Sequence, residues 1–196
     1  MSDDILNQDI FTIDTGAGIL KEEKIEPLPL FDENHPMLSK PIPEYKQALP
    51  NQNMNILIKR LKMTMKQFAG LGLSANQCGV FERVFVIGSE HFQFACINPK
   101  IIDQSAEMIK DNEGCLSYPA LYLKIERPNS IQVEFTDENG QRQQTMLEGL
   151  SARCFLHELD HMNGVRMVDR VKPLALQMAR DKQKKLIKKI SRLYKR

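Results

Sequence analysis

The stretch Ser151-Ala-Arg-Cys-Phe-Leu-His-Glu-Leu-Asp-His161 decides how the rest of this chain is interpreted. As a helix, it places His157 and His161 four residues apart on one face, where both imidazoles can hold a single divalent metal ion. Glu158 lies beside them without being a ligand, which is the position of a general base acting on a metal-bound water. A chance coincidence on an ordinary helix is the competing interpretation. Two of the chain's four histidines fall within these five residues, which favours the metal site.

Two other side chains of this stretch have expected roles. The hydroxyl of Ser151 can accept a hydrogen bond from a free amide of the first turn, so we expect the helix to begin there, one and a half turns before His157. Asp160 either orients a ligand histidine or is a solvated carboxylate on the helix surface, and we favour the solvated role.

A third ligand is sought upstream, in Asn112-Glu-Gly-Cys-Leu-Ser-Tyr-Pro119. Cys115 stands there between a glycine and a proline, in what reads as a loop that can present a thiolate to a metal. Two nitrogens and one sulfur make a three-ligand site with an open fourth position for water, which is typical of catalytic sites. An ordinary buried thiol is an equal alternative for Cys115. Cys154 is the rival sulfur, but three residues before His157 it is poorly placed to complete the site.

Composition restricts the class of protein. The 196 residues are 42% hydrophobic and 27% charged, with a formal net charge of +2, which is typical of a globular domain and too small for nucleic-acid binding by the whole domain. The chain begins with an acidic, polar segment and has no apolar run of bilayer length, so we expect a cytoplasmic protein without a membrane partner. Four cysteines lack the pattern of a disulfide scaffold.

The remaining periodicities predict one amphipathic helix and several strands. Between Met54 and Ala69, apolar residues recur at spacings of three and four. The turn Asp137–Gly140 joins the last two strands in an antiparallel hairpin. The strands, rich in β-branched and aromatic residues, are expected at 83–88, 92–98, 106–110, 122–126, 130–136 and 143–147. Five prolines favour an extended path for residues 28–50.

Gly70-Leu-Gly-Leu-Ser-Ala-Asn-Gln77 ends that helix and opens the first sheet. Its two alternate glycines allow another chain to approach the backbone closely. A helix C-cap followed by a turn is the simpler interpretation.

Taken in order, Gly70–Gln77, Glu113-Gly-Cys-Leu-Ser117 and His157-Glu-Leu-Asp-His161 resemble the three signature motifs of peptide deformylase. The resemblance implies an α+β domain with antiparallel β-sheets around a central helix that carries HExxH. It also implies removal of the formyl group from the N-terminal formylmethionine of nascent polypeptides. It covers residues 27–172, which leaves an N-terminal extension, residues 1–26, and a basic tail, residues 173–196.

Site roles follow from the same resemblance. Cys115, His157 and His161 are then the ligands of one divalent metal, with Fe²⁺ as the native ion and Zn²⁺, Ni²⁺ or Co²⁺ as substitutes. Glu158 is the general base, and the oxyanion is held by the Gln77 amide and the backbone N–H of Leu116. The residues implied to bind substrate are Gly70, Leu71, Gly72, Glu113, Leu150 and Cys154. For Leu150 and Cys154, ordinary core packing is the alternative. Ser74 and Asn76 stand where the family usually has small or proline-like residues.

Two other functions compete with this interpretation. HExxH alone also fits a metalloprotease, but no His or Glu follows His161 to serve as its third ligand. A binding module that keeps a structural metal or docks on ribosomes would need neither Glu158 nor Gln77.

The tail from Pro173 predicts a basic amphipathic helix with apolar residues at near-helical spacing. A solvated surface helix is the simpler interpretation. The functional one, suggested by the resemblance, is electrostatic contact with ribosomal RNA. No specific DNA partner is expected.

Overall fold

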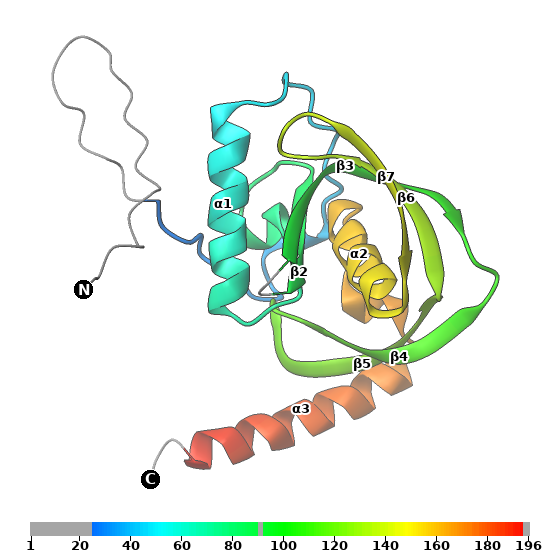
Figure 1. Ribbon diagram of the computed structural model, residues 1–196. Coiled ribbons are helices and arrows are strands. Elements are labelled where there is room, and N and C mark those ends of the chain that lie inside the picture. The colour runs from blue at the N-terminus through cyan, green and yellow to red at the C-terminus, as the bar shows by residue number, and fades with distance from the viewer. Residues whose placement is uncertain (1–24, 90–91, 194–196) are drawn as a thin grey trace, which may run out of the picture.

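Two antiparallel sheets and three α-helices make up the part of the chain that the structure, a computed structural model, describes, which is residues 25–89 and 92–193 (Figure 1). One sheet has the strand order β1-β2-β3-β6-β7, and β4 and β5 form the other. The strands are β1 (Gly72–Ser74), β2 (Val84–Ser89), β3 (Phe92–Gln104), β4 (Met108–Cys115), β5 (Tyr118–Pro128), β6 (Ser130–Thr136) and β7 (Arg142–Glu148). The helices are α1 (Gln52–Gln67), α2 (Gly149–Met162) and α3 (Pro173–Leu193), with 3₁₀ turns η1 (Pro36–Ser39), η2 (Ala75–Cys78) and η3 (Met167–Arg170).

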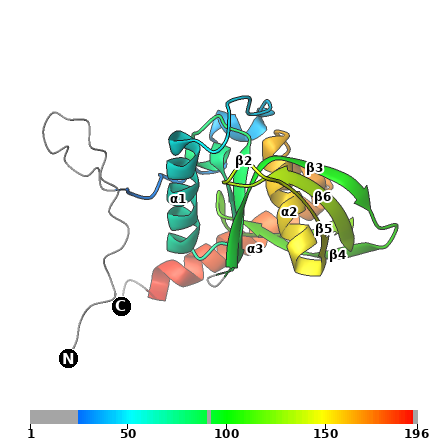
Figure 2. The ribbon, with the colours of Figure 1, turned by 45° about the horizontal axis from the view of Figure 1, so that its top comes forward.

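The larger sheet lies between α1 and α2 (Figures 1 and 2). In β2, Val84 and Val86 join the core on the α1 side, whereas Phe85 and Ile87 join the core around α2. A strand buried on both faces reads as a continuous apolar run, which explains its strong signal in the sequence. On its other side α2 contacts β5 of the smaller sheet. The expected α+β fold, with antiparallel sheets around a central helix, is therefore confirmed.

Most predicted elements are present with shifted ends. Asn51 caps α1 by accepting a hydrogen bond from the backbone N–H of Met54 at 2.9 Å, so this helix begins two residues earlier than expected. β6 has the predicted bounds, and β3 and β5 are longer than predicted. The strand expected at 106–110 corresponds to β4, which begins and ends later, at Met108 and Cys115. Its exposed polar residues, among them Lys110 and Asp111, hid the strand from pattern analysis.

Two local predictions were wrong. Cys115 is the last residue of β4 and not part of a loop, and only Leu116 and Ser117 separate it from β5. Ser151 does not cap α2, since the helix begins at Gly149 with Glu148 at the N-cap position. Gly149 has a φ of +56°, a conformation that glycine adopts easily, and this turns the chain from β7 directly into the helix.

The proline-rich segment is largely extended, as predicted, and is interrupted by a turn at residues 33–34, by η1 and by a few bends. It is tied to the C-terminal end of α2, where the N–H of Ile42 donates to the carbonyl of Met162 at 2.8 Å. The predicted N-terminal extension lies outside the described residues, apart from Ile25 and Glu26. Among the helices described, none combines the length and apolar content needed to cross a membrane.

Candidate functional site

The three predicted metal ligands meet in the structure. α2 presents His157 and His161 one turn apart, and β4 ends with Cys115 against them. One ligand atom of each residue lies within 4.8 Å of the other two, and Cys115 Sγ is 3.3 Å from His161 Nε2. One thiolate and two imidazoles at this spacing fit a single divalent metal ion. Cys154 is not part of this cluster. Its thiol instead donates to the carbonyl of Leu71 at 3.1 Å.

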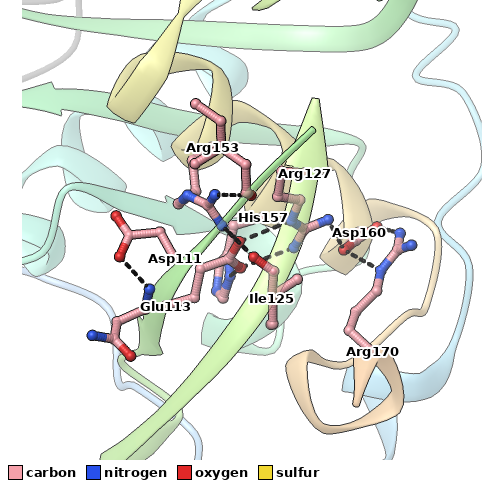
Figure 3. A network of polar contacts seen from close by, with 10 residues as sticks. Asp111, Glu113, Ile125, Arg127, Arg153, His157, Asp160 and Arg170 are labelled. Atoms are coloured by element: carbon pink, nitrogen blue, oxygen red, sulfur yellow. Dashed lines mark hydrogen bonds and ion pairs between the residues drawn. The ribbon is translucent and has the colours of Figure 1, made fainter. Parts of the chain in front are cut away.

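Glu113 fixes the ring of His157 (Figure 3). Its Oε2 lies 3.1 Å from His157 Nδ1, so the carboxylate holds the ring proton there and leaves Nε2 free for a metal. Arg127 donates two bonds of 2.9 Å to the same carboxylate, and Arg153 donates a third of 2.8 Å. Burial raises the pKa of Glu113, but the hydrogen bonds from Arg127 and His157 overcome it and lower that pKa to about 2.

Asp160 is not the solvated carboxylate that we favoured from the sequence. It is buried, and its Oδ2 accepts from Arg127 Nη1 at 2.7 Å and from Arg170 Nε at 2.9 Å. Glu113, Arg127, Asp160 and Arg170 thus form a continuous chain of ion pairs that joins β4, β5, α2 and η3 (Figure 3). This series of ion pairs holds the strand that carries Cys115 against the helix that carries the two histidines.

The arginines of this network were not predicted as site residues from the sequence. Arg127 continues the buried alternation of Leu121, Leu123 and Ile125 along β5, so a basic residue at an inward position was the available signal. Arg153 stands four residues before His157, on the same face of α2. Both arginines are less than a tenth exposed, which a cation tolerates only when it is paired.

We expect Glu113 to make the metal-free protein sensitive to acid. The folded pKa of about 2 lies below the ordinary value near 4.3, so this group stabilises the fold fully above about pH 4.3 and progressively loses that effect as the pH falls toward 2. The shift corresponds to about 3 kcal/mol. In urea unfolding, the stability difference between wild type and Glu113→Gln should therefore shrink between pH 6 and pH 3. A difference independent of pH would contradict this, and the exposed Glu126→Gln serves as the control.

Glu158 stands next to the cluster with one carboxylate oxygen unsatisfied. It is 3% exposed, and its Oε2 has no hydrogen-bond partner among the described residues. Burial raises the pKa of Glu158 to about 7, against the lowering effects of His157 and the Ser74 hydroxyl. A carboxyl group with that pKa can both accept and return a proton near neutral pH. A Cβ at Gly72 would lie 2.4 Å from Glu158 Oε1, so β1 passes this close only because the residue is glycine.

The two predicted oxyanion donors lie beside the cluster. Gln77 Nε2 is 3.3 Å from Cys115 Sγ, and Leu116 directly follows that cysteine. Both residues line a cleft of about 860 Å³, together with Cys115, His157 and Glu158. This volume is in the range of small-molecule sites.

All six residues predicted to bind substrate line the same cleft, namely Gly70, Leu71, Gly72, Glu113, Leu150 and Cys154. Leu71 is 49% exposed and Leu150 is 65% exposed, so these two side chains offer apolar surface that a ligand could cover. Core packing is not the role of Leu150. The half-buried Cys154 both lines the cleft and packs against the core around α2. Phe68 and Tyr122, which were not predicted from the sequence, add exposed aromatic surface to the cleft.

Comparison with known proteins places this geometry in a family. The sequence model described as polypeptide deformylase matches residues 27–177. A peptide deformylase of Thermotoga neapolitana is 38% identical over 135 residues, which cover 69% of this chain and 79% of that protein. A peptide deformylase of Thermotoga maritima is 36% identical over 151 residues, which cover 75% of this chain and 92% of that protein.

Solved structures agree with the sequence comparison. A peptide deformylase from Synechococcus elongatus, in complex with actinonin, superposes with a TM-score of 0.75 at 38% identity and covers 80% of this chain and 86% of that one. A peptide deformylase from Legionella pneumophila superposes with a TM-score of 0.76 at 32% identity and covers 85% of this chain and 98% of that one.

Proposed function

This chain belongs to the polypeptide deformylase family, and from that premise we propose that Cys115, His157 and His161 hold one divalent metal ion for its reaction. The chain is an enzyme of this family, and it removes the formyl group from the N-terminal formylmethionine of nascent polypeptides. The observation that supports the site is the meeting of one sulfur from β4 with two nitrogens from α2. A metalloprotease would need a further ligand after His161, where the sequence has neither His nor Glu.

In the proposed mechanism, Glu158, Gln77 and the backbone of Leu116 act on the formyl group. A divalent cation at the site would supply Lewis acidity that polarises a water molecule and the formyl carbonyl. Glu158 accepts a proton from the water that attacks the formyl carbon, and then delivers it to the nitrogen as the C–N bond breaks and formate leaves. Gln77 Nε2 and the backbone N–H of Leu116 donate to the formyl oxygen as it gains negative charge, and each such donor contributes about 3 kcal/mol.

We further propose that the substrate lies along β1 and in the apolar part of the cleft. β1 is an edge strand of its sheet and Gly72 lines the cleft beside Glu158, so an extended peptide can pair with the backbone there. Leu71, Leu150, Gly70 and Cys154 surround the methionine side chain, with Leu71 and Leu150 contributing the most exposed apolar surface. Glu113 acts mainly through His157, since three arginine bonds occupy its carboxylate.

The ion itself is proposed to be Fe²⁺, as the resemblance implies, with Zn²⁺, Ni²⁺ or Co²⁺ as substitutes. A thiolate and two imidazoles accept all four ions, so the donor set alone does not select one. We expect protein purified without oxygen to contain one iron per chain and to release formate from a formyl-Met tripeptide. Exposure to air should inactivate the iron-loaded protein within a shorter time than the nickel-loaded protein, because Fe²⁺ beside a thiolate oxidises readily. Equal half-lives of the purified protein with and without oxygen would argue against iron, and no formate release by the metal-loaded protein would argue against the proposed site.

The proposed place of action is the cytoplasm, beside ribosomes, with α3 as the contact. Among the residues that the structure describes, α3 is anchored through its first half: Leu176 and Ala179 pack on the β5 core, and Gln183 Nε2 donates to the carbonyl of Pro119 at 2.7 Å. Arg180 pairs with Glu33. The second half extends away from the two sheets (Figure 1) and carries exposed basic residues at positions 184, 185, 188, 189 and 192. Such a surface fits ribosomal RNA.

Neutralising that half of α3 should weaken ribosome binding. We expect glutamine at Lys184, Lys185, Lys188 and Lys189 to reduce the dependence of log K on log salt concentration by up to about 3. Formate release from a free tripeptide should stay unchanged. The control carries glutamine at four exposed lysines elsewhere, Lys46, Lys59, Lys110 and Lys124. Equal binding by both variants would identify α3 as a solvated surface helix.

A further inference from the structure

The orientation of the Gln77 amide is set by its neighbours in the first motif. The backbone N–H of Ser74 donates to Gln77 Oε1 at 3.0 Å. An N–H can only donate, so the oxygen of the amide must face β1 and the NH₂ group must face the opposite way. The NH₂ group accordingly lies 3.3 Å from Cys115 Sγ and 3.1 Å from Ser117 Oγ.

Two buried polar side chains extend this arrangement toward α2. Asn76 Nδ2 donates to the backbone carbonyl of His161 at 2.8 Å, which fixes Asn76 Oδ1 toward Ser74. The hydroxyl of Ser74 lies 2.9 Å from both Asn76 Oδ1 and Gln77 Oε1. Neither Ser74 nor Asn76 is exposed, so water does not compete for these bonds. The single proton of this hydroxyl is therefore shared by the two amide oxygens and by the carboxylate of Glu158, to which the hydroxyl also hydrogen-bonds.

We propose that Ser74 and Asn76 are positioning residues that fix the amide of Gln77 for the reaction by tying it to the backbone of His161. The connection runs from the His161 carbonyl through Asn76 and Ser74 to Gln77, and from there to the sulfur of Cys115. It thus joins the amide of Gln77, the proposed oxyanion donor, to His161 of α2 and to Cys115 of β4. The inference rests on the role of Gln77 proposed above.

The physical reason is preorganisation. A side-chain amide stabilises a developing oxyanion only while its NH₂ group faces that oxygen, and the flipped amide would present its own oxygen and repel the charge. Ser74 also sits at the N-cap of η2 and forms a capping box with Gln77. If Ser74 were only a structural cap, Ser74→Ala would lower stability, and any loss of kcat would be the same with and without Gln77. The two roles can therefore be separated by experiment.

The test is a double-mutant cycle on the full-length, cobalt-loaded protein. Ser74→Ala, Gln77→Ala and the combined variant are compared with wild type for kcat and KM on a formyl-Met tripeptide. The sulfur-to-cobalt absorption band of each protein gives a second readout, because Gln77 Nε2 contacts Cys115 Sγ. Ser105→Ala is the matched control, since this hydroxyl also makes two hydrogen bonds, to Glu107 and from Ser130, but lies outside the cleft.

We expect Gln77→Ala to lower kcat about 100-fold and Ser74→Ala to lower it about 10-fold, with KM within a factor of about two. In the Gln77→Ala background, Ser74→Ala should have no further effect on kcat. Ser74→Ala should also shift the absorption band, and Ser105→Ala should change neither readout. An equal loss of kcat in both backgrounds, an effect on KM alone, or an unchanged kcat in the folded Ser74→Ala protein would overturn the inference. Failure of wild type to release formate would instead overturn the proposed function, and the absorption band would still report on the contact between Gln77 and Cys115.

Discussion

Replacing Glu158 with glutamine is expected to lower kcat for formate release by about 1000-fold and to leave the bound metal and KM nearly unchanged. Glutamine has the shape of glutamate, so it should fit the space beside Gly72 that the carboxylate occupies now. It cannot accept the proton of the attacking water or return it to the leaving nitrogen. The measurement is steady-state formate release, with metal content determined on the same sample.

The pH profile gives the same prediction a second readout. Glu158 acts as a base, so activity should rise with pH through the pKa of this carboxyl group. Burial places that pKa at about 7 in the metal-free chain, and a neighbouring dication lowers it, so the acidic limb of the kcat/KM profile should lie below pH 7. This limb should be absent from Glu158→Gln. The exposed Glu126→Gln should keep wild-type activity, and a Glu158→Gln protein with near-normal kcat would rule out Glu158 as the base.

Replacing Cys115 with alanine is expected to remove the metal and nearly all activity. The change leaves two imidazoles from one helix as the protein ligands. Loss of an outer-shell partner alone typically costs 10–100-fold in metal affinity, so loss of a ligand should lower kcat/KM by at least about 1000-fold. Metal analysis after dialysis should find well under one ion per chain.

Cys96 provides the matched control for this substitution. It is a free cysteine, fully buried in β3, and does not line the cleft. Cys96→Ala makes the same change of a thiol to a methyl group, so it should lower stability slightly but keep the metal and kcat within about two-fold. If Cys115→Ala retained a full complement of metal, the sulfur would not be a ligand, and the three-residue cluster would need another explanation.

Local sequence patterns were sufficient for the elements and for the two histidines. The spacing of His157 and His161 depends only on the period of a helix, and the apolar residues of α1 follow the same period. β2 is a short continuous apolar run, which is typical of a strand buried on both faces. These features are properties of neighbouring residues, so no knowledge of the fold is needed to recognise them. The exposed strand β4 lacked such a pattern, which explains its misplaced bounds.

Long-range pairing decided everything that joins separate elements. The sequence left Cys115 open as a ligand, and only the approach of β4 to α2 brings its sulfur to the histidines. Asp160 seemed solvated because its partners, Arg127 and Arg170, lie on other elements. The helix α2 itself begins at Gly149 because β7 ends there, and not because of a cap at Ser151. Spacing along the chain determines which side chains share one face of a helix or strand. Only the tertiary structure determines which buried charges pair, because pairing depends on packing between elements that are far apart in sequence.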